Sequence, residues 1–193
     1  MKLHLACGNT KLSGWVNVDI SPQVNPDVVA DLTKIPWSWI SDADRYIIDG
    51  SVDEIYSSHF IEHLGDEFIP FMDECHRVLK PGGLFRIRCP YYSSIRAWQD
   101  PTHKRAISEA TFHYFNAKER NAMGVSHYGI KSDFDVQELR LHFPENMQQM
   151  PEDERTFMLT HALNTAADIE VLLKKHDPNE QGVDRQKNKM VSN

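Results

Sequence analysis

Small residues followed by an aspartate near the N-terminus have the chemistry to bind a nucleoside. The apolar run 3–5 leads into Ala6-Cys7-Gly8, where small side chains let a ligand approach the main chain. Asp19 ends the next apolar run, and a carboxylate there can accept hydrogen bonds from two ribose hydroxyls. A glycine turn followed by an aspartate is also an ordinary strand ending, so this pair alone leaves both interpretations open.

A second group of residues has the spacing of a metal site. His59, Glu62 and His63 read H-x-x-E-H, the inverted zincin pattern in which two histidines bind zinc and a glutamate acts as base. That interpretation requires a helix and a third ligand elsewhere. In the alternative, the same residues form a strand-to-helix junction where His63 packs or caps. We favour the junction and expect no bound metal, with a zinc metallohydrolase as an alternative.

A third group follows the fifth apolar run. Ligands of open α/β sheets bind beyond the carboxyl ends of the strands, so this loop should cover an acceptor. Near neutral pH His103 can remove a proton from an acceptor, or it can order the loop together with Asp100. Tyr91 and Tyr92 can stack on a planar or sugar acceptor, or pack within the loop. We therefore expect these four residues to line the substrate site.

The elements that position these residues are short apolar runs between turns. This pattern is typical of strands that alternate with helices or loops around a largely parallel sheet, so the class is α/β. The expected helices cover residues 66–80, where apolar side chains recur at helical spacing, 108–115 and 152–164. The expected strands are 2–6, 15–19, 27–30, 54–57, 84–89, 134–143 and 168–173.

The first crossover is too short for a helix. Only about ten residues separate Gly8 from Asp19, whereas an average helix takes about 11. The N-terminal half should therefore have reduced helical cover. We expect the thin face of the sheet to be sealed by a second subunit or by large apolar side chains, namely Trp15, Trp37, Trp39 and Ile40.

Four segments, in order along the chain, resemble the motifs of small class I S-adenosylmethionine-dependent methyltransferases of the type 11-like family. They are residues 3–19, 31–32, 57–64 and 77–83, the last reading R-V-L-K-P-G-G. The resemblance implies a Rossmann-like, mostly parallel, seven-stranded sheet with helices or loops on both faces. It implies one domain over residues 1–176, followed by a polar tail at 177–193.

The resemblance also implies a cofactor, S-adenosyl-L-methionine, and the residues that bind it. Asp19 would bind the ribose, and His103 and His59 are the candidate catalytic residues. Ala6 stands where the family usually has a glycine, which restricts close approach of the backbone. The remaining roles follow the motifs: Ala6, Cys7 and Gly8 at the methionine portion, Asp31 and Leu32 at the adenine, and Ser58 and His59 beneath the sulfonium.

The implied reaction is direct in-line transfer of the sulfonium methyl group to an acceptor. By analogy the acceptor is a small molecule or a glycan. A non-catalytic protein that binds S-adenosylmethionine as a partner or regulatory subunit stays an alternative. A nicotinamide-dependent oxidoreductase is disfavoured because the G-x-G-x-x-G run is missing.

Composition limits the remaining possibilities. A chain of 193 residues with 40% hydrophobic content suits one globular domain. The net charge of -7 does not favour nucleic acid as a partner. Three cysteines without a C-x-x-C pair indicate a reducing compartment, and the short apolar N-terminus suits neither a signal peptide nor a membrane span. We expect a cytoplasmic protein without membrane contact, either a monomer or a homo-oligomer.

Overall fold

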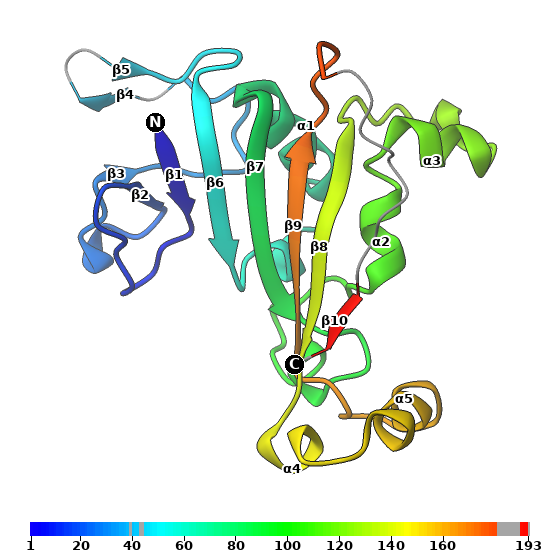
Figure 1. Ribbon diagram of the computed structural model, residues 1–193. Coiled ribbons are helices and arrows are strands. Elements are labelled where there is room, and N and C mark those ends of the chain that lie inside the picture. The colour runs from blue at the N-terminus through cyan, green and yellow to red at the C-terminus, as the bar shows by residue number, and fades with distance from the viewer. Residues whose placement is uncertain (39, 43–44, 181–189, 193) are drawn as a thin grey trace.

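A computed structural model describes residues 1–38, 40–42, 45–180 and 190–192, which form one large sheet with helices around it (Figure 1). A separate antiparallel pair consists of β4 Ile40–Asp42 and β5 Arg45–Tyr46. The strands of the large sheet are β1 Lys2–Leu5, β2 Val16–Asp19, β3 Val28–Val29, β6 Val52–Ser58, β7 Leu79–Pro90, β8 Phe134–His142, β9 Asp168–Lys175 and β10 Met190–Ser192.

The strand order is β10-β8-β9-β7-β6-β1-β2-β3. Neighbouring strands are parallel except for β9, which is antiparallel to both β7 and β8. The predicted seven-stranded, mostly parallel sheet is confirmed, and β10 adds a short eighth strand from the segment expected to be a polar tail. Because β6, β1, β2 and β3 are adjacent and parallel, their carboxyl ends meet at one edge of the sheet.

Helix α1 Phe68–Val78 covers one face of the central strands and passes behind β7 in Figure 1. Its buried side contacts the sheet through Phe71, whose ring lies edge-to-face with Phe85 at 6.3 Å. The helix ends just before the bend that opens β7. A Cβ at Gly83 would lie 2.9 Å from the Lys80 carbonyl oxygen, so this bend requires glycine. The helix predicted over 66–80 is therefore confirmed.

The helices predicted over 108–115 and 152–164 are also confirmed. Ser108 is the N-cap of the first, as its residue type predicts, and its backbone N–H donates to the Thr111 hydroxyl. The remaining helices are α2 Glu109–His113, α3 Ala117–Ala122, α4 Glu145–Gln148 and α5 Glu152–His161, and the 3₁₀ turns are η1 Pro22–Val24, η2 Ile61–His63, η3 Ile95–Ala97 and η4 Ser126–Tyr128.

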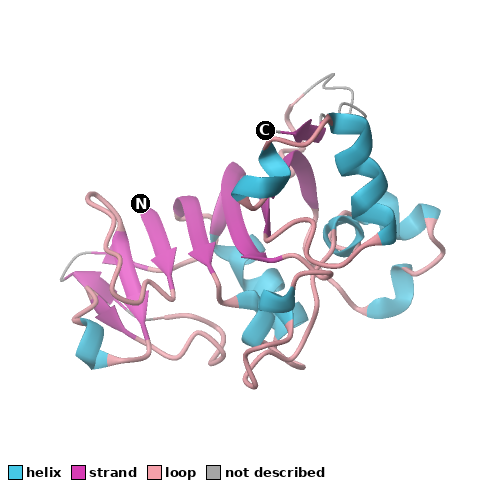
Figure 2. Ribbon diagram, turned by 90° about the horizontal axis from the view of Figure 1, so that it is seen from below, coloured by secondary structure: helices cyan, strands magenta, loops and turns pink. Residues whose placement is uncertain are grey.

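The connection between β1 and β2 contains no helix: residues 6–15 are all described and form turns and loop. Figure 2 shows the result, because the half of the sheet near the N-terminus is flanked mainly by loops, whereas helices gather around the other half. The loop is held by Asn17, whose side-chain oxygen accepts from the Leu12 amide and whose Nδ2 donates to Asp27. The reduced helical cover follows the short crossover.

The tryptophans divide between the two faces of the sheet. Trp37 is buried, but it packs on the face that α1 covers, with its ring 5.8 Å from that of Phe71. Trp15 is partly exposed, and the Lys2 ammonium lies 5.2 Å from the centre of its ring. Trp39 and the side chain of Ile40 lie outside the described residues. Trp37 therefore seals the core beside α1.

One finding bears on membrane contact. Within the described ranges, no helix combines the length and the apolar character needed to cross a membrane.

Candidate functional site

The turn after β1 and the end of β2 are joined through one carboxylate. The Gly8 amide donates to Asp19 Oδ2 at 2.9 Å, and the Ser21 amide donates to Oδ1 at 2.9 Å. Asp19 is only 9% exposed, so both oxygens are fixed beside the turn. Ala6 and Gly8 have positive φ angles of 53° and 52°. This turn therefore brings together the first four residues predicted to bind the cofactor.

The positive φ at Ala6 carries an energetic cost. An L-residue in the left-handed region loses roughly 1–2 kcal/mol relative to the right-handed one, whereas glycine loses little. The family's usual glycine at this position would adopt the same bend freely. The alanine keeps the bend but adds a methyl group to it.

The segment after β3 follows the same edge of the sheet. The Ala30 amide donates to the Asp19 carbonyl oxygen at 2.9 Å, which ties this segment to β2. Asp31 Oδ1 accepts from the amide and the hydroxyl of Thr33, and these hydrogen bonds lower the pKa of the Asp31 carboxyl. Leu32 is buried, and its carbonyl oxygen accepts from the Trp37 indole at 3.1 Å. An acidic and an apolar group thus flank the edge that Asp19 occupies.

His59 lies just beyond the end of β6 with a φ of 54°. Its amide donates to the Arg88 carbonyl oxygen at 2.8 Å, which continues the pairing with β7 past Ser58. Its ring lies between two carboxylates: Nδ1 is 3.4 Å from Glu62, and Nε2 is 3.8 Å from Asp168. The side chain is 36% exposed, so it can meet a ligand at this edge.

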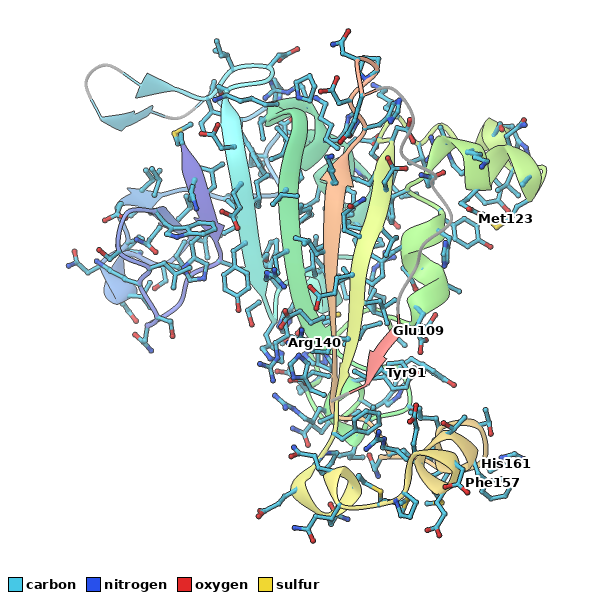
Figure 3. All side chains as sticks on the ribbon, viewed as in Figure 1. Tyr91, Glu109, Met123, Arg140, Phe157 and His161 are labelled. Carbon is cyan, nitrogen blue, oxygen red and sulfur yellow. The ribbon has the colours of Figure 1, made fainter. Side chains whose placement is uncertain are left out.

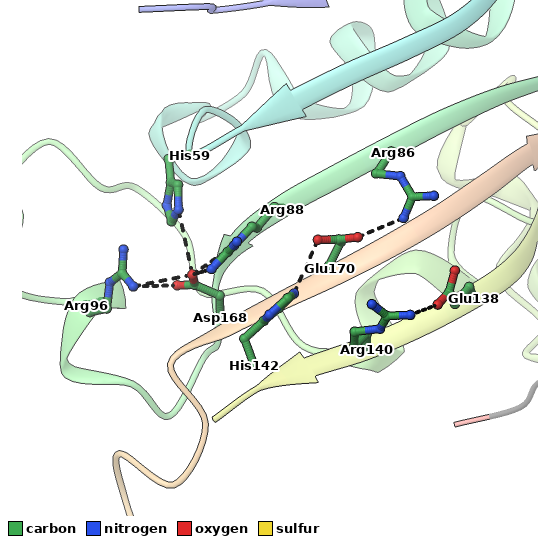
Figure 4. A network of polar contacts seen from close by, with 9 residues as sticks. All are labelled: His59, Arg86, Arg88, Arg96, Glu138, Arg140, His142, Asp168 and Glu170. Atoms are coloured by element: carbon green, nitrogen blue, oxygen red, sulfur yellow. Dashed lines mark hydrogen bonds and ion pairs between the residues drawn. The ribbon is translucent and has the colours of Figure 1, made fainter. Parts of the chain in front are cut away.

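A network of ion pairs covers the sheet face opposite α1 (Figure 4). Asp168 is fully buried, and it receives Arg88 at 2.7 Å and Arg96 at 3.1 Å. Two residues earlier in β7, Arg86 pairs with Glu170 of β9 at 2.7 Å. Both arginines of β7 point to this face, and their guanidinium groups are paired with carboxylates of β9.

The loop that follows β7 returns to the end of β6. The amides of Lys104 and Arg105 donate to the Glu62 carbonyl oxygen, at 2.8 and 3.3 Å. This anchoring brings the ring of His103 to 4.7 Å from the ring of His63. The His103 side chain is only 10% exposed, so it is largely enclosed.

Within that loop, Asp100 organises the turn before His103. Asp100 Oδ1 accepts from the amide and the hydroxyl of Thr102, at 2.8 and 2.7 Å, and these hydrogen bonds lower the pKa of the Asp100 carboxyl. Its other oxygen lies 3.9 Å from His103 Nε2. The carboxyl of Asp100 therefore shapes the loop and faces His103.

The two tyrosines at the start of the loop differ in exposure. Tyr91 is 4% exposed, and its hydroxyl donates to Glu109 at 2.9 Å; Figure 3 labels both residues. Burial raises the pKa of Tyr91, and the Glu109 carboxylate raises it further. Tyr92 is 41% exposed, and its ring lies 4.7 Å from that of Tyr91. Only Tyr92 thus presents substantial ring surface to a ligand.

Sequence reasoning named Glu62 only as part of the H-x-x-E-H pattern, and it missed Asp168. Glu62 is 1% exposed, and Asp168, on β9, is fully buried. Burial raises the pKa of the Cys89 thiol, and these two carboxylates raise it further. Alternating arginines in β7 face alternating acids in β9, a pattern from which the ion pairs could have been predicted.

The H-x-x-E-H segment is not a helix. His59 follows a strand, and Glu62 and His63 lie in the 3₁₀ turn η2, so the two histidines do not share a helical face one turn apart. The strand-to-helix junction predicted for these residues is confirmed. The geometry required for a zinc hydrolase of the inverted zincin type is therefore missing from this segment.

The strand order, the turn after β1 and the acidic residue ending β2 match the fold of class I S-adenosylmethionine-dependent methyltransferases. S-adenosyl-L-methionine is the methyl donor of that class. Residues 3–87 match the family model described as a methyltransferase domain. The fold predicted from the sequence is confirmed, and residues 3–87 are similar to this family.

Particular proteins are similar to this chain. A probable S-adenosylmethionine-dependent methyltransferase of Mycolicibacterium smegmatis is 38% identical over 72 residues, which is 35% of this chain and 28% of that protein. A SAM-dependent methyltransferase from Archaeoglobus fulgidus has a TM-score of 0.60 at 20% identity, over 90% of this chain and 85% of the other. A SAM-dependent methyltransferase from Methanosarcina mazei has a TM-score of 0.55 at 13% identity, over 91% and 92%. At these identities the structures show the shared fold.

Proposed function

We propose that this protein transfers the methyl group of S-adenosyl-L-methionine to a small-molecule or glycan acceptor. The observation that carries the proposal is the Asp19 carboxylate, which is fixed by the Gly8 amide beside a turn of positive φ. A carboxylate held in this way accepts the two ribose hydroxyls of a nucleoside without reorganising. Asp31 and Leu32 would hold the adenine, and Ala6 and Cys7 would lie along the methionine portion.

Methyl transfer is a direct displacement, in which the acceptor atom attacks the sulfonium methyl group and S-adenosylhomocysteine leaves. The acceptor loses a proton as the new bond forms. We assign the proton acceptor to His59, because its side chain is 36% exposed, whereas that of His103 is 10% exposed. The Glu62 and Asp168 carboxylates beside its ring would stabilise the imidazolium that results.

The acceptor would lie between Ser58 and the loop after β7. Tyr92 offers the exposed ring for stacking, and Tyr91 supports it from behind. Asp100 would face a polar group of the acceptor, because its side chain is 44% exposed. An uncharged, hydroxyl-bearing acceptor suits this mixture of aromatic and carboxylate groups.

In the first experiment the whole chain is titrated with S-adenosylhomocysteine and, separately, with NAD, and binding is measured by calorimetry. We expect one equivalent of S-adenosylhomocysteine to bind and NAD not to bind. Binding of NAD alone would contradict the proposal and favour an oxidoreductase.

Transfer itself is measured with S-adenosylmethionine that carries a tritiated methyl group, over a panel of small hydroxyl acceptors and glycans. For the acceptor that is labelled, His59→Asn should lower kcat by about 10²- to 10⁴-fold, while cofactor affinity changes little. Asparagine tolerates the positive φ at this position, so the backbone is preserved. Cofactor binding without transfer to any acceptor would instead support a non-catalytic binding protein.

A further inference from the structure

Three potential metal ligands meet where the loop after β7 touches the turn after β6. They are Glu62, His63 and His103, and one ligand atom from each lies within 4.8 Å of the other two. Glu62 and His63 come from η2, whereas His103 comes from a loop about 40 residues later. The set differs from the H-x-x-E-H motif, because His103 takes the place of His59.

The hydrogen bonds of the two histidines indicate which ring nitrogen carries a proton. His103 Nδ1 lies 3.1 Å from the Ala97 carbonyl oxygen, which can only accept, so Nδ1 carries the proton. His63 Nδ1 lies 2.9 Å from the Thr102 hydroxyl. That hydroxyl donates its own proton to Asp100, so it accepts from His63. In the neutral form of each ring, Nε2 is therefore the nitrogen without a proton, the one that can bind a metal, and Nδ1 has the orienting partner typical of metal-bound histidines.

The Glu62 carboxylate is buried without a hydrogen bond from any described residue. Its side chain is 2% exposed, and neither oxygen has a hydrogen bond within the described part of the chain. His59 Nδ1 lies 3.4 Å from Oε1, but without the geometry of a hydrogen bond. A buried carboxylate without hydrogen bonds is strongly unfavourable, and a bound cation removes that penalty.

We propose that Glu62, His63 and His103 form a binding site for a divalent transition metal, with zinc as the best fit. Two imidazoles and one carboxylate are a ligand set that zinc prefers, at bond lengths of about 2.0–2.2 Å. Those bonds place tetrahedral ligands roughly 3.4 Å apart, so rotation of the three side chains would close the site. Three protein ligands leave a fourth position open for water or an oxygen of a ligand. The proposal does not depend on methyl transfer.

The experiment uses the whole chain, stripped of metal with a chelator and then titrated with Co²⁺ and Zn²⁺. Co²⁺ should bind at one equivalent and give visible absorption bands of a tetrahedral site, and Zn²⁺ should displace it. His63→Ala and His103→Ala should each weaken zinc binding at least about tenfold, and Thr102→Val should do so by about tenfold through loss of the orienting hydrogen bond. His161→Ala is the matched control, because this exposed histidine lies on α5 (Figure 3) and has Phe157 and Thr160 of the same helix as its ring and hydrogen-bond partners.

Glu62→Gln separates a metal ligand from a merely structural acid. The change removes a buried charge that has no hydrogen bond in the described ranges, so the metal-free variant should have a higher Tm than the unchanged protein, while added zinc should no longer raise it. Absence of one-equivalent binding to the unchanged protein would overturn the proposal, as would equal zinc affinity in the His63 and His161 variants. Binding of S-adenosylhomocysteine, measured with zinc and with chelator, is a separate readout, so failure of the metal site does not imply failure of the cofactor site.

Discussion

Replacing Asp19 with asparagine tests the cofactor site most directly. In the folded protein the Asp19 carboxylate accepts one hydrogen bond from Gly8 and one from Ser21. Asparagine has one oxygen, so one of these amides would face an NH₂ group. Losing a hydrogen bond to a largely buried donor costs about 1–3 kcal/mol. For a domain of this size, that lowers Tm by about 2–12 °C.

The effect on cofactor binding is separate and larger. A charged acceptor makes hydrogen bonds of about 1.5–3 kcal/mol, and asparagine can accept from only one of the two ribose hydroxyls. We therefore expect Asp19→Asn to lose about 2–3 kcal/mol of binding free energy. This corresponds to an affinity for S-adenosylhomocysteine about 30- to 150-fold weaker, measured by titration calorimetry well below the Tm of the variant.

Asp27→Asn is the matched control. Asp27, the residue before β3, also accepts two hydrogen bonds, from the amide and the side chain of Asn17, at 2.8 and 2.7 Å. Its replacement should lower Tm to a similar or smaller extent but leave S-adenosylhomocysteine affinity unchanged. If folded Asp19→Asn bound the ligand as tightly as Asp27→Asn does, the ribose assignment would be refuted.

Two further predictions concern the backbone and the core. Ala6→Gly should leave the free energy of unfolding unchanged or raise it by up to about 1 kcal/mol, because glycine adopts the positive φ of this turn freely. A lower free energy of unfolding, measured by urea denaturation, would contradict this. Burial, followed by the charge of Lys175, lowers the pKa of His76 to about 4, so the folded protein keeps this ring neutral while the unfolded chain protonates it near pH 6.5. Stability should therefore fall as the pH drops from about 6.5 to 4, and His76→Gln should remove on the order of 1–2 kcal/mol of that loss, after allowance for partial exposure of the ring. Urea unfolding of both proteins at several pH values checks this, and identical pH dependence would refute it.

Local patterns predicted most of the fold. In a strand such as β7, every second side chain is buried. In α1, buried side chains recur every three or four residues. Both periods can be recognised within a dozen residues. The absence of a helix after β1 was also predictable, because the number of residues between Gly8 and Asp19 is too small for one.

Contacts between distant segments were harder to predict. Arg88 and Asp168 are 80 positions apart, and their pairing depends on β9 lying antiparallel beside β7. Trp37 was expected on the thin face, yet it packs beside α1 because its indole donates to Leu32 and its ring meets Phe71. Side-chain type alone does not specify which face a loop residue reaches.

By itself, the sequence determined the class of fold, the elements and the turn that presents Asp19, since each depends on residues close together in the chain. Only the tertiary structure decided that His103, rather than His59, joins Glu62 and His63, and that the Glu62 carboxylate is buried without a hydrogen bond among the described residues. The physical reason is that burial and ligand geometry depend on how a later loop folds back, and the Glu62 carbonyl oxygen anchors that loop through two backbone amides.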